Sequence, residues 1–371
     1  MRAPVAIVYH DEMLQHQPPG LEPEMRDYHA RQLRARLGEL VASGLWRHPE
    51  RPERLSSLVE RAREFDDGSL LWLSPERADE ETVRRAHTGG HMERLDKLRG
   101  RKRMLSIDST AVSPESVDAA FRAAGAACTA VDAVCDGRAS SAFALVRPPG
   151  HHATAAHYQG FCLVNNVAVA ARHAMAVHGA ERVLIVDWDV HHGNGTASIF
   201  ADDPDVLFFD IHRGAPYYPG TGALDDVGRG RARGTNLNVP LPAATSDLAV
   251  LEAFDRILIP AARRFKPDLV LVSAGFDGTR EHLACKFSTA LYAHLTDRMR
   301  RLADHLCAGR LALVLEGGYH LEPMREGLVQ CLRALGTPGG ELPPLQRSRI
   351  GLPAVRHAAD ALAQLSFLLR D

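Results

Sequence analysis

Acidic and histidine side chains alternate over one short segment of the chain. Asp187, Asp189 and His191 are separated by single residues. Side chains alternate along a β-strand, so residues two positions apart project to the same side. Carboxylate oxygen and imidazole nitrogen are suitable ligands for zinc and similar divalent ions. The spacing indicates a metal site at Asp189 and His191, and Asp277, at the end of another apolar segment, is the best candidate for a third ligand.

A second interpretation of Asp189 and His191 needs no metal, because the two side chains could form a hydrogen-bonded pair near the start of a helix. Four other apolar segments favour the metal, since each is also followed by polar groups and glycines. These segments lead into RPPGHH (147–152), His212 with YYPGTG (217–222), GFD (275–277) and EGGY (316–319). Buried carboxylates without partners are costly, and a cation would offset that cost.

His151 and His152 are adjacent in one of these polar groups. A metal site with three protein ligands needs a general base for its water, and a histidine suits that role near neutral pH. The pair could instead ligate a metal or form a hydrogen-bonded loop pair. Tyr319 lies on a glycine-rich turn, where its hydroxyl could donate a hydrogen bond to a developing oxyanion; the alternative is a structural tyrosine.

Strands and helices must position these groups. Short segments rich in Val, Leu and Ile, typical of parallel strands buried on both faces, occur at 4–9, 142–146, 183–190, 206–211, 268–274 and 311–316. Helical patterns occur at 115–135, 165–178, 247–265, 287–307 and 355–369. The alternation predicts one α/β domain over residues 1–371 with a central parallel sheet. Ligands bind beyond the carboxyl ends of such strands, where the polar groups stand.

The overall charge argues against polyanionic partners. Lys and Arg total 44 and Asp and Glu total 46, for a formal net charge of -2, so no global basic field recruits nucleic acid or an anionic membrane. The six cysteines form no CxxC pair, which is typical of reduced thiols in a cytoplasmic protein. We find no signal-peptide pattern and no window of ~18 apolar residues, and we expect a cytoplasmic location.

Residues 21–46 form a segment with its own pattern. Leu33, Leu37, Leu40 and Val41 are spaced for one face of a helix. The segment could pack on its own core. It could also be an exposed arm that shapes the site entrance or joins two copies of the chain into a homo-oligomer.

Taken in order, these motifs resemble those of the histone deacetylase and acetylpolyamine amidohydrolase family. The resemblance covers about residues 1–335 and rests on HPERPERL (48–55), AHTGGHMERL (86–95), RPPGHHA (147–153), GFCLVNN (160–166), VDWDVHHGNGT (186–196), YPGTG (218–222), SAGFD (273–277) and EGGY (316–319). Asn194 and Trp188 are similar to the class II-like branch. The resemblance implies the arginase/deacetylase fold, with a mostly parallel eight-stranded sheet flanked by helices.

The resemblance also implies roles for the site residues. One zinc ion per chain would be held by Asp189, His191 and Asp277. His151 and His152 would flank the reacting water, with His152 the general base, and Tyr319 would polarise the acyl carbonyl. Asp187 would hold His151, and Asn194 would support His152, since such outer contacts orient catalytic groups.

The substrate channel follows from the same resemblance. Phe161 and Tyr218 match the two aromatic walls around the substrate's alkyl chain, and Gly160 and Leu283 would line the same channel. The stretch 278–284 lacks the family's common Asp-Pro-Leu-Gly and is one residue shorter, so the pocket mouth departs from the family pattern.

A structural potassium ion is a further implication. Its ligands would be drawn from Asp187, Asp189, His191, Asp210 and Ile211, several of them through backbone carbonyls. Asp210 stands where the family usually has Ser or a similar small residue. An added carboxylate there could strengthen the cation site or change its occupancy.

Several functions are consistent with these residues. The first is zinc-dependent hydrolysis of an acylated amine, acetyl-lysine or a related acyl-lysine, to a free amine and a carboxylate. The alternative is an acetylpolyamine amidohydrolase, whose distal ammonium could be met by acidic groups at Glu281, Glu22, Glu24 or Asp27. A non-catalytic acyl-lysine binding module is a third hypothesis, and an arginase-like enzyme would need further carboxylate ligands that the sequence does not offer.

Overall fold

Eight parallel strands form the centre of the protein. The computed structural model describes residues 3–19, 29, 31–32, 47–282, 284–337 and 339–370. Within these residues the strand order is β2-β1-β5-β10-β9-β6-β7-β8, and every neighbouring pair is parallel. The bounds are β1 Val5–Val8, β2 Leu70–Leu73, β5 Ser141–Ala144, β6 Val183–Asp187, β7 Val206–Arg213, β8 Asn236–Leu241, β9 Leu269–Ala274 and β10 Leu311–Leu315. The predicted eight-stranded α/β architecture is confirmed.

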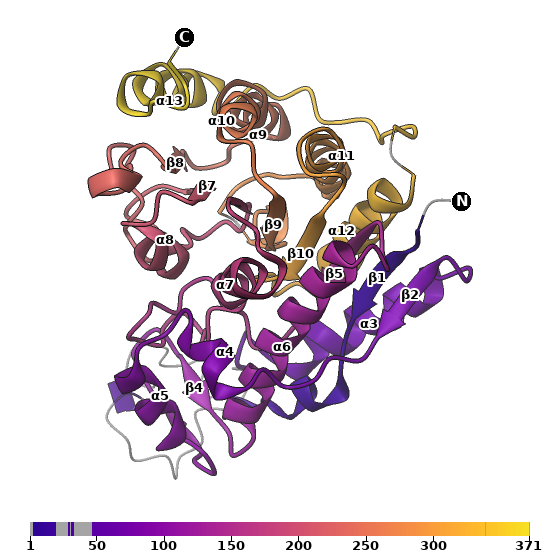
Figure 1. Ribbon diagram of the computed structural model, residues 1–371, viewed down its shortest axis with the longest axis vertical. Helices are drawn as coiled ribbons and strands as arrows, with labels where there is room; N and C mark the ends of the chain where they lie inside the picture. The colour runs from indigo at the N-terminus through magenta and orange to yellow at the C-terminus, as the bar shows by residue number, and fades with distance from the viewer. Residues whose placement is uncertain are drawn as a thin grey trace.

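Helices cover both faces of this sheet. In Figure 1, α6 and α7 lie on one side of β9 and β10, and α11 and α12 lie on the other. The helix bounds are α3 Pro52–Phe65, α4 Glu80–Arg84, α5 Gly89–Asp96, α6 Ser116–Cys135, α7 Asn166–His178, α8 Asn194–Phe200, α9 Asp247–Ala253, α10 Ile259–Phe265, α11 Thr289–Leu306, α12 Leu321–Gly336 and α13 Leu352–Leu365. Because the helices shield both faces, the residues of β5, β6, β9 and β10 are all buried.

The continuous apolar strands were the ones that the sequence predicted, with ends shifted by up to three residues. The two edge strands of the sheet, β2 and β8, were not predicted. The residues of β2 are all half-buried, and β8 interrupts its apolar residues with Asn236, Asn238 and Pro240. Helices α3, α4, α5, α8 and α12 were also not predicted.

The helix predicted over 247–265 consists of three parts. α9 ends at Ala253, a π-helical turn η3 spans Phe254–Leu258, and α10 begins at Ile259. Pro260 has no N–H to donate to the preceding turn, which accounts for the break in α-helical bonding.

Outside the large sheet, β3 (Arg103–Met104) and β4 (Ala111–Val112) form a short antiparallel pair. The loop between them carries Asp108 and Thr110 towards the site described below. Among the described helices, none is both long and apolar enough to cross a membrane. The predicted arm at 21–46 lies outside the described residues except at 29 and 31–32, and Leu283 also lies outside them.

Candidate active site

Three ligand atoms converge at the carboxyl ends of β6 and β9. Nδ1 of His191 lies 3.1 Å from Oδ1 of Asp189 and 3.0 Å from Oδ2 of Asp277. Asp189 and Asp277 are fully buried, whereas a fifth of the His191 side chain is exposed. The structure therefore brings together the three residues that the sequence proposed as metal ligands, and the group opens to solvent on the histidine side.

Backbone amides hold the two carboxylates in place. The N–H of Val190 donates to Oδ1 of Asp277 at 2.9 Å, and the N–H of Gly317 donates to Oδ2 of Asp189 at 2.8 Å. Gly317 has no room for a side chain, because a Cβ there would lie 2.4 Å from Asp277 and 2.5 Å from Asp189. The remaining oxygens, Oδ1 of Asp189 and Oδ2 of Asp277, are the ones that face His191.

His151 and His152 lie beside this group with different partners. Nδ1 of His151 is 2.9 Å from the Asp187 carboxylate, and Nδ1 of His152 is 2.8 Å from Oδ1 of Asn194. The centres of the two rings are 4.1 Å apart, and Nε2 of His151 lies 3.9 Å from Oδ1 of Asp189. Asp187 and Asn194 thus contact the histidines to which the resemblance had assigned them.

The surroundings of His151 and His152 shift their pKa values in opposite directions. Burial opposes a charge on His151, but Asp187 and Asp189 raise its pKa well above the usual histidine value. Burial and the positive charge of His151 lower the pKa of His152 well below that value. A neutral His152 that donates Nδ1–H to the Asn194 oxygen carries its lone pair on Nε2, and that nitrogen is free to accept a proton.

A buried glutamate fixes the loop that carries both histidines. Oε2 of Glu316 accepts the N–H of Gly150 at 2.7 Å and the N–H of His151 at 3.1 Å. Glu316 directly follows strand β10, so the segment that leads from this strand to Tyr319 also anchors the histidine loop. The histidines and the tyrosine are therefore positioned by one common element.

Tyr319 is held by two residues that the sequence had not singled out. The Arg54 guanidinium lies 4.7 Å from the centre of the tyrosine ring and donates to the carbonyls of Glu316, at 2.6 Å, and Gly318. Nε2 of His282 accepts the N–H of Tyr319 at 2.8 Å. Burial raises the pKa of Tyr319 well above that of a free phenol, so its hydroxyl stays protonated and remains a hydrogen-bond donor.

Arg54 is itself fixed by a buried charge network. Oε1 of Glu50 lies 2.7 Å from Arg54 and 2.7 Å from Arg147, and His16 lies 3.1 Å from the other oxygen of Glu50. Glu50, Arg54 and Arg147 are fully buried. Although burial opposes ionisation, Arg147 and the other partners lower the pKa of Glu50, so it stays ionised. The network explains in physical terms why HPERPERL carries charge into the core.

The predicted channel residues lie beside the histidines and Tyr319. The Phe161 ring is 5.8 Å from the Tyr319 ring, and the Tyr218 ring is 5.2 Å from the His152 ring. Gly160 packs directly on His152, because its φ is +56° and a Cβ there would lie 2.3 Å from the imidazole. Only glycine fits both the conformation and the contact.

Asp108, which the sequence reasoning missed, organises this channel. Its Oδ2 accepts the N–H of Gly160 at 3.0 Å and the hydroxyl of Tyr218 at 3.0 Å. Thr110 accepts the N–H of Phe161 at 3.0 Å. Burial opposes ionisation, but hydroxyl groups of Ser106 and Thr110 lower the pKa of Asp108, so the carboxylate is charged. Its position in the β3–β4 loop gave no strand-end signal.

Two further tyrosine and aspartate contacts complete the region. The ring of Tyr217 stacks on the ring of His191, with their centres 5.1 Å apart. Asp210 pairs with His212 at 2.7 Å and accepts the N–H of Gly193 at 2.8 Å. Asp210 and Asp187 are register partners on adjacent strands, with Ile211 next to Asp210 in β7. The added carboxylate thus has protein partners of its own.

Comparison with known proteins gives this site a context. The family model for the histone deacetylase domain matches residues 48–335. The chain is 47% identical over 220 residues to "Histone deacetylase 14, chloroplastic" from Arabidopsis thaliana, covering 57% of this chain and 52% of that protein. It is 39% identical over 321 residues to "Polyamine deacetylase HDAC10" from Homo sapiens, covering 81% of this chain and 47% of that protein. The chain spans about half the length of these two relatives.

A solved structure shares the whole architecture. The HD domain of HDA15 superposes with a TM-score of 0.84 and 32% sequence identity, covering 98% of this chain and 95% of that one. The residues of the family match, 48–335, include His151, His152, Asp189, Asp277 and Tyr319. The chain therefore belongs to the histone deacetylase family.

Proposed function

We propose that this protein is a zinc-dependent amide hydrolase that removes acyl groups from acyl-lysine side chains and releases a free amine and a carboxylate. One observation carries the proposal: the metal-ligand group, the two histidines of unlike charge and the protonated Tyr319 meet at one end of the sheet. That combination supplies a base, an acid and an oxyanion donor around a single point, as amide hydrolysis requires.

The three ligand residues suit one zinc ion per chain. One imidazole nitrogen lies near 3 Å from two carboxylate oxygens, and a single N–H cannot satisfy both well. Burial disfavours a charge there, but Asp277 and Asp189 raise the pKa of His191 to about 9, because two buried carboxylates attract a positive charge. Carboxylate oxygens and an imidazole nitrogen are zinc ligands, and three protein ligands leave a position for water, as in catalytic zinc sites. Bound zinc would lower the pKa of a water molecule and polarise the substrate carbonyl.

The protein side chains then divide the remaining work. Nε2 of neutral His152 takes a proton from the attacking water. The hydroxyl of Tyr319 donates a hydrogen bond to the carbonyl oxygen as negative charge develops on it. His151, held by Asp187, supplies positive charge beside the reacting centre and can give a proton to the leaving amine. Asn194 keeps His152 in the tautomer that this sequence of steps needs.

An acetylated polyamine is the second candidate substrate. Glu281 is exposed in the short helix η4 (Arg280–His282), next to the residue that holds Tyr319, and could meet a distal ammonium. A relative named for polyamine deacetylation shares 39% identity with this chain. We favour acyl-lysine because the YPGTG segment (218–222) resembles the lysine-deacetylase side of the family. Phe161 and Tyr218 of the proposed channel flank the histidines and Tyr319.

A structural potassium ion is also part of the proposal. Asp187 and Asp210 are buried register partners on adjacent strands, so two carboxyl groups that repel each other when ionised stand side by side. A monovalent cation between these strands, held by Asp187 and carbonyl oxygens nearby, would relieve that repulsion. Removing potassium from the buffer should lower the melting temperature of the wild type more than that of an Asp210→Ser variant.

The cysteines bear on the cellular setting. All six cysteines are free thiols, and five are buried, which suits a reducing compartment such as the cytoplasm. We further propose that residues 1–371 act as one domain, with acyl-amine substrates rather than nucleic acid or membranes as partners. The proposed homo-oligomer through residues 21–46 can be tested by comparing the solution mass of the full chain with that of a variant carrying Leu33→Ser and Leu37→Ser.

A side-by-side turnover assay tests the function. Acetyl-lysine peptides, longer acyl-lysine peptides, acetylspermidine and acetylputrescine should be compared at equal concentration, with Glu281→Gln as the matched variant. The proposal predicts that a peptide substrate has the highest kcat/KM and that Glu281→Gln leaves it unchanged. Preference for acetylspermidine, lost in Glu281→Gln, would assign the second candidate instead. No turnover of any acyl-amine by zinc-loaded protein would overturn the hydrolase assignment.

A further inference from the structure

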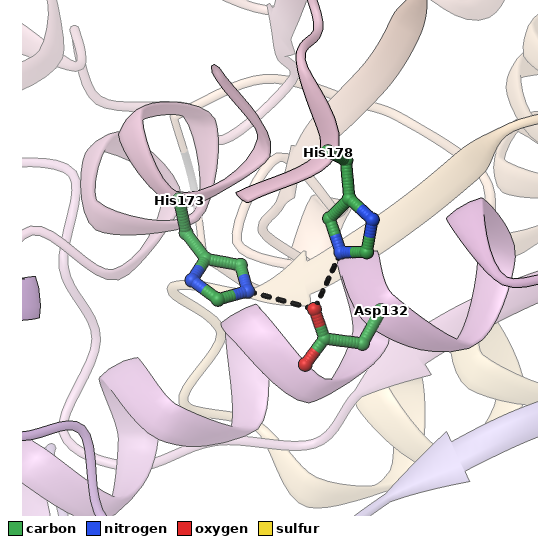
Figure 2. Close-up of side chains that lie close together, drawn as sticks. All are labelled: Asp132, His173 and His178. Carbon is green, nitrogen blue, oxygen red and sulfur yellow. Dashed lines mark hydrogen bonds and ion pairs between the residues drawn. The ribbon is translucent and has the colours of Figure 1, made fainter. Parts of the chain in front are cut away.

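A second group of metal-binding side chains lies away from the active site. Asp132 projects from α6, and His173 and His178 project from α7 (Figure 2). Nε2 of each histidine is 2.7 Å from the same carboxylate oxygen, Oδ1 of Asp132. Within the described part of the chain, this group and the catalytic one are the two sets of at least three candidate ligands whose ligand atoms all lie within 4.8 Å of one another.

The fold brings the three residues together. Helices α6 and α7 pack side by side against the same side of the sheet, so that side chains from both meet between them. His178 is the last residue of α7, and Gly179, with a φ of 66°, ends the helix in a left-handed turn. The chain leaves the helix at the point where His178 points back to Asp132.

The side chains of Asp132, His173 and His178 are all partly buried. The exposed fractions are 14% for His173, 17% for His178 and 31% for Asp132. The two imidazole rings are therefore mostly shielded from solvent, and both face the same carboxylate oxygen. The carboxylate itself is more exposed than either ring. An ion could enter from that side, and water could fill its remaining positions.

A second carboxylate stands behind one of the histidines. Oδ1 of Asp136, one turn after Asp132, lies 3.9 Å from Nδ1 of His178. A carboxylate on the far nitrogen favours the tautomer whose Nε2 carries the lone pair, as is common for histidines that bind metals. Cys128, one turn before Asp132, is buried and burial raises its pKa far above the usual thiol value, so it stays a thiol and offers no thiolate ligand.

We propose that Asp132, His173 and His178 bind a divalent transition-metal ion, with zinc as the first to test. Two imidazole nitrogens and one carboxylate oxygen suit zinc, and three protein ligands leave room for water. The ion joins α6 to α7 and acts as a structural clamp. α7 begins at Asn166, whose side chain donates to the carbonyl of Pro148, close in sequence to His151 and His152. His178 lies twelve residues later, roughly 18 Å along the helix at 1.5 Å per residue. The clamp should therefore affect stability and leave turnover unchanged.

Zinc stoichiometry measures the second site directly. The full-length wild type, stripped with a chelator and dialysed against buffered zinc, should hold two zinc ions per chain by elemental analysis. His173→Gln with His178→Gln should hold one and keep wild-type turnover, with affinity at the clamp lowered by at least ~100-fold, beyond the loss typical of outer-sphere changes alone. A variant with Asp189→Asn and Asp277→Asn should also hold one, at the clamp.

Matched controls keep the test decisive. His305→Gln with His357→Gln removes two exposed helical histidines elsewhere, and it should hold two zinc ions. Zinc should raise the melting temperature of the double catalytic variant but not that of the same variant with His173→Gln and His178→Gln added. Asp132→Asn provides an independent loss of the site if the histidine variant folds poorly. Equal zinc content in the wild type, the His173/His178 variant and Asp132→Asn would overturn the proposal.

Discussion

Removal of the Tyr319 hydroxyl is the sharpest test of how the active site divides its work. Burial keeps this phenol protonated, so in the proposed reaction it donates one hydrogen bond to the developing oxyanion. Loss of one such donor typically costs about 2.7–4 kcal/mol of transition-state stabilisation, a fall in kcat of about 100- to 1000-fold. Tyr319→Phe should show that fall with acetyl-lysine peptide and little change in KM.

The variant should leave the fold and the metal group intact. Arg54 lies over the ring and Phe161 packs at its edge, and a phenylalanine ring keeps both contacts. The melting temperature and the zinc content should therefore match the wild type. If Tyr319→Phe retains more than about a third of wild-type kcat with full zinc, a change worth less than ~1 kcal/mol, the tyrosine is not the oxyanion donor.

Three further predictions follow from individual contacts. Gly160→Ala should lower kcat by about 100-fold, because its methyl would displace the His152 ring and misplacement by about 1 Å has that effect; a Gly160→Ala enzyme with normal kcat would refute the contact. His282→Ala should lower kcat by about 10-fold with unchanged KM, because the N–H of Tyr319 loses its acceptor, and His282→Asn should recover part of the loss if positioning is the cause. Burial lowers the pKa of His87 to about 3, below its unfolded value of about 6.5, so the unfolded chain binds the extra proton between those values and the free energy of unfolding falls as pH drops through this window. Chemical denaturation at several pH values should show a slope smaller by up to ~1.4 kcal/mol per pH unit in His87→Gln; an unchanged slope would contradict the assignment.

The strand ends could be predicted because buried parallel strands have short, continuous apolar sequences. Once β6, β9 and β10 are placed side by side, their carboxyl ends meet, and Asp189, Asp277 and Tyr319 have to lie near one another. The two end strands, β2 and β8, lack that continuous pattern, and the sequence did not predict them.

The residues that support the site could not be predicted in the same way, since their contacts cross long stretches of chain. Asp108 reaches Gly160 over 52 positions, and Arg54 reaches Gly318 over 264. His282 lies within the stretch 278–284, where the sequence departs from the family pattern, and that departure was the only signal of its role. Local periodicity carries no information about which distant loop a side chain will bind.

The metal requirement of hydrolysis is the most direct test of the account. Chelator-stripped protein carrying His173→Gln and His178→Gln should be titrated with zinc while acetyl-lysine peptide turnover is followed, so that bound zinc reports only the group of Asp189, His191 and Asp277. Turnover should rise from near zero in proportion to zinc and stop rising at one ion per chain, and adding Asp277→Asn should abolish the rise. Full turnover by the stripped protein, or an unchanged titration in the Asp277→Asn variant, would contradict hydrolysis at this metal centre.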